Sequence, residues 1–229
     1  MSDIIRKQID AYRPNFLEHG DTPRGTYQNN TTTQNERFGR LLRHLEEYGP
    51  EHFSVCDVGC GMADLHRYMN ANAISHDYTG IEIVPEMVEQ TRSKYPDIEV
   101  LDVDLQTHDF RSVFDFCVLS GTFNLPGDVS ETGWEEFVLN TIERMYGLAG
   151  IGISFNLLTS YSTFKAKELF YADPAEIYDF LQKKLSRFIM VDTTSPLFEL
   201  TFTVLRPEAV RARYDHPDLK KYFSAGDSA

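Results

Sequence analysis

The sequence predicts an α/β fold, in which helices cover both faces of a mostly parallel sheet of seven strands. Short apolar segments rich in β-branched and aromatic residues alternate with segments whose apolar residues recur at helical spacing. Such alternation is typical of right-handed strand–helix–strand units. The last two apolar segments follow each other without a helix between them, so they predict an antiparallel hairpin at the C-terminal end of the sheet.

The composition is that of a folded globular protein in a reducing compartment. The chain has 229 residues, enough for one domain with its own core, and 41% of them are hydrophobic. Its three cysteines lack CxxC spacing and fall on or beside predicted strands, so we expect reduced core residues and no metal site. The N-terminus has charges threaded through it, and no apolar run approaches the ~20 residues that cross a bilayer. We therefore expect a cytoplasmic protein without a membrane partner.

The charge of the chain argues against nucleic acid as a partner. Acidic residues outnumber basic residues by 35 to 22, which gives a net charge of −13. Such a field repels a phosphate backbone, and no run of more than two basic residues offsets it. The sequence leaves the oligomeric state open.

The first fifty residues precede the predicted sheet. Helical spacing predicts a helix over residues 3–12, which Pro14 ends, and a second helix over residues 34–48. The Gly-, Asn- and Thr-rich stretch between them, residues 19–33, is predicted to be a loop.

The parallel part of the sheet begins at Phe53. Residues 114–119 are nearly all apolar, which is typical of a central strand buried on both faces, and Pro85 suits the first turn of a helix. This part is predicted to contain strands over residues 53–58, 78–83, 98–103, 114–119 and 150–155, with helices over residues 62–72, 85–95 and 134–145.

The C-terminal third adds an insertion and the hairpin. Residues 157–172 are rich in aromatic side chains and interrupt the alternation, and a helix follows over residues 173–184. The hairpin strands are predicted over residues 188–191 and 197–205. Residues 207–229 are predicted to form a surface helix and a frayed tail.

The strongest local signal is a strand, a glycine turn and a helix in succession. Residues 53–61 read FSVCDVGCG, so Gly59 and Gly61 break an apolar strand just before a helical pattern begins. Glycine has no Cβ and lets a ligand approach the main chain closely, and the first turn of a helix offers unpaired N–H groups. This combination predicts a cradle for a small molecule.

Two motifs in this region resemble those of a known family. Residues 55–61, which read VCDVGCG, with Asp64 and Leu65, resemble motif I of the class I S-adenosylmethionine (SAM) dependent methyltransferases. Residues 78–83 and the helix that opens at Pro85 resemble the second cofactor motif of that family. Two linked motifs are more specific than one.

The resemblance extends in kind to about residue 206, although only residues 53–105 are diagnostic of the cofactor. It implies a Rossmann-like methyltransferase domain over residues 51–206, with the insertion over residues 157–172. It also implies that the N-terminal helical segment, residues 1–50, covers the site, and that residues 207–229 form a tail.

The predicted cofactor site follows from strand ends. Ligands of open parallel sheets bind beyond the carboxyl ends of the strands, where strand order reverses. Glu82 lies 21 residues after Gly61, close to the ~20-residue offset at which a carboxylate meets the ribose hydroxyls of an adenosine. Asp104 is expected to accept from the adenine amine, and Ile83 to pack on the ring. The predicted cofactor residues of the sheet and its helices are Asp57, Gly59, Cys60, Gly61, Asp64, Glu82, Ile83, Met87, Asp104, Leu105 and Ser120. Arg37 is added from the N-terminal segment, which the resemblance places across the cofactor, with a solvated helix residue as its alternative.

The resemblance places the transferred methyl group beside the segment after the fourth strand. A small-molecule acceptor is expected there, held through a hydroxyl, an amine or a carboxylate. The predicted acceptor-binding residues are Tyr27, Asn124, Asn156, Tyr161 and Tyr171, with core packing as the structural alternative for the tyrosines.

No catalytic residue is assigned. Methyl transfer from a sulfonium depends on positioning, and a general base is needed only for an acceptor that carries a proton. His66, His76 and His108 are candidate bases by their chemistry, and each has a structural role as its alternative.

Two other functions fit the same sheet. A NAD(P)-dependent oxidoreductase uses G-x-G-x-x-G, but here Asp64 occupies the third glycine position. Its charge opposes a diphosphate and favours the sulfonium and ammonium of SAM, unless Asp64 merely caps the helix. A non-catalytic SAM-binding protein is the other alternative. The predicted function is SAM-dependent transfer of a methyl group to an oxygen, nitrogen or carboxylate of a small molecule.

Overall fold

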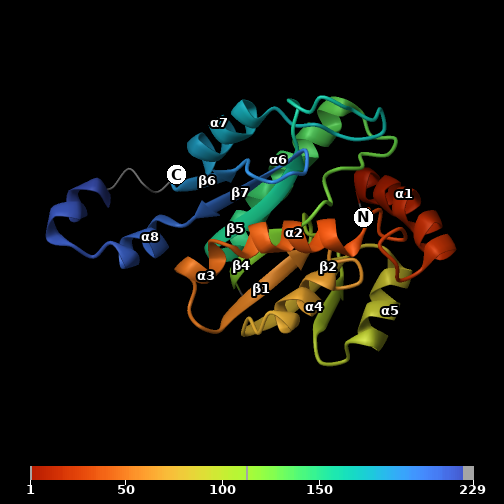
Figure 1. The fold of residues 1–229 in the computed structure, drawn as a ribbon, viewed down its shortest axis with the longest axis horizontal. Helices are drawn as coiled ribbons and strands as arrows, with labels where there is room; N and C mark the ends of the chain where they lie inside the picture. The colour runs from red at the N-terminus through yellow and green to blue at the C-terminus, as the bar shows by residue number, and fades with distance from the viewer. Residues whose placement is uncertain (1, 112, 224–229) are drawn as a thin grey trace.

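The computed structural model describes residues 2–111 and 113–223 and contains a seven-stranded sheet in the order β3-β2-β1-β4-β5-β7-β6 (Figure 1). The parallel strands are β1 (Phe53–Val58), β2 (His76–Glu82), β3 (Glu99–Asp102), β4 (Phe114–Leu119) and β5 (Ala149–Leu158). At the C-terminal end, β7 (Glu199–Leu205) runs antiparallel between β5 and β6 (Ile189–Asp192). The predicted fold class is confirmed.

The order of the strands reverses between β1 and β4. From β1 the chain adds β2 and β3 on one side, and then returns to place β4 and β5 on the other. In such sheets a crevice forms at the carboxyl ends of the two strands that flank the reversal. The arrowhead of β1 points toward α1 (Asp3–His19), so this edge of the sheet faces the N-terminal helix (Figure 1).

Each face of the sheet has its own core. On one face, α6 (Glu131–Leu148) and α7 (Pro174–Lys184) bury side chains that include Trp134 and Leu181. On the other face lie α2 (Thr31–Leu42), α3 (Leu45–Tyr48), α4 (Asp64–Ala71) and α5 (Pro85–Lys94). The strands alternate between the two cores, since Val55 contributes to the second core and Cys56 to the first. This alternation explains why both faces need helices.

The prediction that Pro14 ends the first helix was wrong. The helix α1 continues through Pro14 to His19, and Gly20 caps it with an N–H donated to the Phe16 carbonyl oxygen at 2.7 Å. An internal proline removes one backbone hydrogen bond. Phe16 is only 3% exposed, so the burial of this side chain beyond the proline offsets that loss.

The remaining boundaries differ by a few residues. Asn30 caps α2 by accepting the Thr33 N–H at 2.9 Å, so this helix begins inside the predicted loop. The strand β5 extends to Leu158, two residues into the predicted insertion, because it pairs with β7 as far as Glu199.

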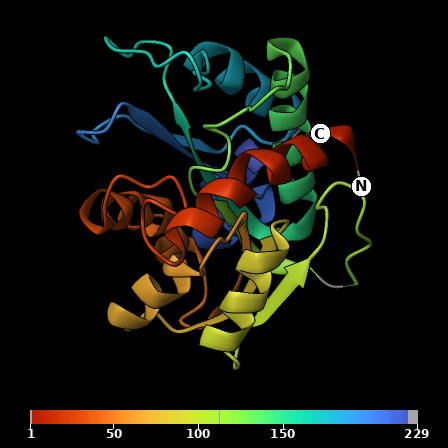
Figure 2. The same ribbon diagram turned by 90° about the vertical axis from the view of Figure 1, so that its right-hand side faces the viewer.

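The ends of the described chain lie far apart. The helix α1 crosses the molecule at the carboxyl edge of the sheet, as Figure 2 shows. The helix α8 (Pro207–Arg213) and the 3-10 helix η1 (Pro217–Phe223) extend from the body at the opposite end (Figure 1). Residues 224–229 of the predicted tail lie outside the described residues. Within residues 2–111 and 113–223, none of the helices has the length and apolar character needed to cross a membrane.

Candidate functional site

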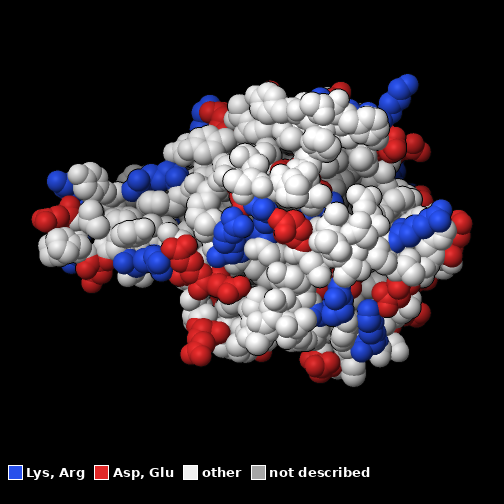
Figure 3. Space-filling view, viewed as in Figure 1, with Lys and Arg blue, Asp and Glu red and all other residues white. Residues whose placement is uncertain are grey.

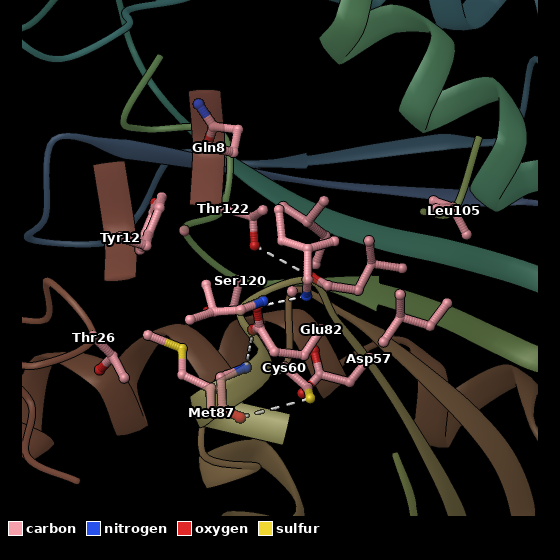
Figure 4. A pocket seen from close by; sticks show the side chains of 18 of the residues that line it. Gln8, Tyr12, Thr26, Asp57, Cys60, Glu82, Met87, Leu105, Ser120 and Thr122 are labelled. Carbon is pink, nitrogen blue, oxygen red and sulfur yellow. Dashed lines mark hydrogen bonds between the residues drawn. The ribbon is translucent and has the colours of Figure 1, made fainter. Parts of the chain in front are cut away.

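A cavity lies at the carboxyl ends of the parallel strands, beside α1 and the loop between α1 and α2 (Figure 4). We call the strand-end side the floor; it contains Asp57, Gly59, Cys60, Gly61, Glu82, Asp104 and Ser120. The opposite side of the cavity is formed by residues that precede β1 in the chain, and we call it the roof. It contains Ile5, Gln8, Tyr12, Thr26, Gln28, Gln34 and Phe38.

Both glycines of the turn have a backbone conformation that favours glycine, and Gly59 also has no room for a side chain. Gly59 has a φ of +72° and Gly61 a φ of +53°, in the left-handed region that side chains disfavour. A Cβ on Gly59 would stand 2.3 Å from Thr122 Oγ1, which is far inside contact distance. The Gly59 and Cys60 N–H groups both donate to the Ile81 carbonyl oxygen, at 2.8 and 3.0 Å. The turn is therefore fixed between β2 and the segment after β4.

Glu82 ties the turn to the end of β2. Its Oε2 accepts the Gly61 N–H at 2.9 Å, and its Oε1 accepts the N–H groups of Ile83 at 2.7 Å and Val84 at 2.9 Å. Burial raises the pKa of this carboxyl, and the three N–H groups act in the opposite direction. A carboxylate offers about four lone-pair positions, so roughly one remains, on Oε2, for a further donor.

A second buried acid lies beneath the turn. The Tyr78 hydroxyl donates to Asp57 Oδ2 at 2.6 Å, and Asp57 is only 3% exposed. Burial, together with the charges of Glu82 and Asp64, raises the pKa of Asp57 to about 7, and the hydrogen bond from Tyr78 acts in the opposite direction. When ionised, these three carboxyls give the floor a negative potential, which favours a cationic ligand.

The far end of the floor presents an unpaired acceptor. Asp104 Oδ1 accepts the Gln106 N–H at 3.0 Å, whereas the buried Asp104 Oδ2 has no hydrogen-bond partner among the described residues. Such an atom costs about 1–3 kcal/mol unless a donor reaches it. Apolar side chains, including Leu105 and Ile83, line the cavity beside it. A flat ring with an amino group suits this end.

Side-chain contacts hold the segment before β1 against α4, α5 and the segment after β4. Gln8 Nε2 donates to the Pro126 carbonyl oxygen at 3.1 Å, and Gln34 Nε2 donates to Asp64 Oδ2 at 3.0 Å. On the outside, Arg13 Nε donates to Glu86 Oε1 at 2.8 Å. The Lys94 ammonium lies 2.8 Å from Asp21 Oδ2.

Every predicted cofactor residue except Arg37 lines the cavity. The Arg37 guanidinium instead pairs with Glu199, with Nε at 2.8 and 2.7 Å from the two carboxylate oxygens and Nη2 at 2.5 Å from Oε1. Its Nη1 donates to Gln28 Oε1. Arg37 does not line the cavity, and at 9% exposed it is not a solvated helix residue either.

The predicted acceptor-binding residues do not line this cavity, and their contact with the acceptor stays a prediction. Asn156 is buried and bridges the Gly121 N–H and Glu199. The Tyr27 hydroxyl donates to the Ala11 carbonyl oxygen, and the Tyr171 hydroxyl accepts the Ala166 N–H. Tyr161 is 74% exposed. The Asn124 side-chain oxygen is buried without a partner among the described residues.

The three candidate histidine bases also lie outside the cavity lining. His66 Nδ1 lies 3.0 Å from His76 Nε2, and His76 Nδ1 lies 2.7 Å from the Ile74 carbonyl oxygen. Burial lowers the pKa of His66. The His108 ring packs edge-on against Phe110. The contacts of all three histidines therefore fit a structural role.

Sequence reasoning missed most of the roof. Gln8, Tyr12, Thr26 and Gln28 line the cavity but belong to no motif, and only the packing of α1 and its loop brings them there. On the floor side, Thr122 lines the cavity and was not predicted to do so. It lies in the segment after the fourth strand, beside which the methyl group was expected.

Known proteins resemble this chain in sequence and in fold. The sequence profile of the family described as "Methyltransferase domain" matches residues 55–139. The protein described as "Putative methyltransferase Rv1506c" of Mycobacterium tuberculosis is 32% identical over 154 residues, which cover 66% of this chain and 92% of that protein.

Solved structures share the fold at low identity. Magnesium protoporphyrin IX methyltransferase from Synechocystis PCC 6803, with bound SAM, superposes with a TM-score of 0.61 at 16% identity and covers 87% of this chain and 97% of that one. The N-methyltransferase NodS from Bradyrhizobium japonicum WM9, in complex with S-adenosylhomocysteine, superposes with a TM-score of 0.61 at 14% identity, over 87% and 98%.

Proposed function

Because the chain belongs to the class I SAM-dependent methyltransferase family, we propose that it transfers a methyl group from SAM to an oxygen, nitrogen or carboxylate of a small-molecule acceptor. SAM is the donor of this family.

The donor is proposed to lie across the strand ends in the order of the sheet. Its adenine amine would donate to Asp104 Oδ2, the unpaired buried acceptor at the β3 side. The ribose would lie at Glu82, at the end of β2, and the sulfonium over the glycine turn that follows β1. The negative potential of the floor supports this placement because the sulfonium is a cation.

Glu82 carries most of this proposal. Its carboxylate is buried, is fixed by three backbone N–H groups, and belongs to a residue that lines the cavity, and its Oε2 accepts only one of those N–H groups. A hydroxyl donor there would complete its hydrogen bonding. The same carboxylate holds the glycine turn, so the ligand contact and the shape of the turn depend on one residue.

The chemistry asks for positioning above all. A lone pair of the acceptor attacks the methyl carbon while the carbon–sulfur bond breaks, and its electron pair stays on sulfur as S-adenosylhomocysteine. Holding donor and acceptor in line supplies most of the rate, with effective molarities of ~10⁵ M or more. The floor would bind and orient the donor, and the roof would exclude water.

Several observations support a small-molecule acceptor over a nucleic acid. The roof lies over the cavity, and the net charge of −13 opposes a phosphate backbone. On the face that Figure 3 shows, lysines and arginines lie among acidic residues. Two of the structural relatives are described as an amino pentose methyltransferase and a 1,6-didemethyltoxoflavin-N1-methyltransferase, whose acceptors are small molecules.

Binding and turnover test the proposal separately. S-adenosylhomocysteine at about 100 times its dissociation constant should stabilise the protein by ~2.7 kcal/mol, while NAD should not. Incubation with SAM and a fractionated small-molecule extract should then release S-adenosylhomocysteine together with a methylated product. Stabilisation by NAD alone would contradict the donor site, and donor binding without turnover on any fraction would favour a non-catalytic SAM-binding protein.

A further inference from the structure

The carboxylate of SAM poses a charge problem in this cavity. A bound anion needs N–H donors, and it is best served by charged ones. Yet among the described residues no lysine, arginine or histidine lines the cavity, and its ionised side chains are acids. The group that donates a hydrogen bond to the SAM carboxylate must therefore be neutral.

The N–H groups of Gly59, Cys60 and Gly61 do not supply this hydrogen bond. The Gly59 and Cys60 N–H groups donate to the Ile81 carbonyl oxygen, and the Gly61 N–H donates to Glu82. Beside the turn, the Gly121 N–H donates to Asn156 Oδ1 at 2.8 Å. Each of these donors is already used by the protein.

Gln28 is a roof residue with a free side-chain N–H group near Gly121. Arg37 can only donate, so its contact fixes Gln28 Oε1 as the acceptor and turns the amide nitrogen away from Arg37. Gln28 lines the cavity, and its Nε2 lies 3.3 Å from the position that a Cβ on Gly121 would take. Among the described residues, Gln28 Nε2 donates to no acceptor.

A buried network fixes Arg37 behind Gln28. Both oxygens of Glu199 accept from Arg37, and Asn156 Nδ2 donates to Glu199 Oε2 at 2.7 Å. Asn156 in turn accepts the Gly121 N–H, so the network runs from the roof through β7 and β5 to the segment after β4. Arg37, Glu199 and Asn156 are each at most 9% exposed. The amide of Gln28 is thus oriented before any ligand arrives, and the guanidinium polarises it.

We propose that Gln28 binds the carboxylate at the amino-acid end of SAM through its Nε2, and that Arg37 is its positioning residue. This inference rests on the proposed placement of the donor. With the adenine at the end of β3 and the ribose at the end of β2, the amino-acid end reaches the ends of β1 and β4, where Gln28 lies over Gly121. Arg37 acts through Gln28 and stays paired with Glu199.

The test compares two ligands that differ at this end. S-adenosylhomocysteine carries the amino-acid group, and 5′-methylthioadenosine lacks it. The variant Gln28→Glu keeps the size of the side chain and an oxygen for Arg37, but it removes the N–H donors and adds a negative charge. Calorimetry should show about tenfold or more weaker binding of S-adenosylhomocysteine, with binding of 5′-methylthioadenosine changed by less than about twofold.

Two further variants complete the experiment. Gln182→Glu makes the same chemical change at an exposed position on α7 and should leave both affinities unchanged. Arg37→Lys keeps the charge but cannot hold Glu199 and Gln28 together, so it should reduce selectively the affinity for S-adenosylhomocysteine.

Each other outcome contradicts the inference. Unchanged affinities in Gln28→Glu would mean that Gln28 faces something else, and an equal loss for both ligands would mean that the residue only supports the fold. If the wild-type protein bound neither ligand, the proposed function would fail together with this inference. Binding of both ligands without discrimination by Gln28→Glu would leave the proposed function intact and remove only the carboxylate site.

Discussion

The floor and the roof of the cavity are built in different ways. The floor is held by backbone N–H groups: those of Gly59 and Cys60 donate to the Ile81 carbonyl oxygen, and those of Gly61, Ile83 and Val84 donate to the Glu82 carboxylate. The roof is held by side-chain contacts over long sequence distances, such as the one between Arg37 and Glu199, 162 residues apart. A backbone-held site tolerates few residue types, whereas a side-chain network can be rearranged by single substitutions. The floor should therefore respond to mutation more strongly than the roof.

The largest effect is expected from Gly59→Ala on the floor. The new methyl group meets Thr122 Oγ1 at 2.3 Å and sits on a backbone with a φ of +72°. Strain and overpacking together should lower the free energy of unfolding by about 2–4 kcal/mol and abolish donor binding. Urea denaturation measures the first effect and calorimetry the second.

Gly147→Ala is the matched control for that change. Gly147 lies inside α6, and nothing comes within 4 Å of the position of its Cβ. Alanine should therefore stabilise the helix by about 0.5–1 kcal/mol and leave binding unaltered. Equal destabilisation by the two variants would mean that the turn has no special requirement for glycine.

Glu82→Ala should produce the next largest effect. It removes the proposed ribose contact and leaves the N–H groups of Gly61, Ile83 and Val84 without their acceptor. Binding of SAM should weaken at least about tenfold, measured by calorimetry on the folded variant. An unchanged dissociation constant would count against the floor as the donor site.

The pH dependence of donor binding should be smaller and confined to the floor. Burial raises the pKa of Asp57 from an ordinary 3.8 to about 7. Between these two pH values the folded protein therefore holds a proton that the unfolded chain has lost. Raising the pH from about 4 to 7 therefore removes stability from the free protein. A sulfonium nearby favours the ionised carboxylate, so SAM binding should strengthen with pH until it levels off above about 7.

The comparison with S-adenosylhomocysteine isolates this effect because that ligand has no sulfonium charge. The affinity for S-adenosylhomocysteine should change less over the same pH range. Asp57→Asn should remove the difference in pH dependence between the two ligands. If the affinities of the wild-type protein for both ligands changed in parallel with pH, the ionisation of Asp57 beside the sulfonium would be excluded as the cause of the pH dependence.

The smallest effect is expected at the outer edge of the roof. Arg13 and Glu86 pair at the surface, with exposed side-chain fractions of 52% and 27%. Such a pair contributes at most about 1 kcal/mol, so Arg13→Gln should change the dissociation constant for SAM by only a few-fold. A loss as large as that of Glu82→Ala would show that the roof, and not the floor, dominates binding.

The same contrast explains what the sequence could predict. The floor was predictable because a turn with two left-handed residues requires glycines, and because Glu82 follows Gly61 at a spacing that one helix and one strand fix. Arg37 was predicted as a direct cofactor contact, but no local pattern reveals that Glu199 lies beside it. Gln28 has no motif at all, since its orientation depends on Arg37.

Composition misled where tertiary packing decides. The helix α1 passes through Pro14 because Phe16 is buried beyond it. In the insertion, aromatic residues predicted acceptor contacts, but Tyr161 is 74% exposed and does not line the cavity, so its contact with the acceptor stays a prediction. Strand alternation, by contrast, predicted the fold correctly, because every strand of the sheet must satisfy the same geometry.

The most direct test of the donor site is a crystal structure of the protein grown with S-adenosylhomocysteine. We predict that the ligand lies between floor and roof, with its adenine amine at Asp104 Oδ2 and a ribose hydroxyl at Glu82 Oε2. Density elsewhere in the molecule, or an adenine placed at the β4 end with no contact to Glu82, would contradict the account.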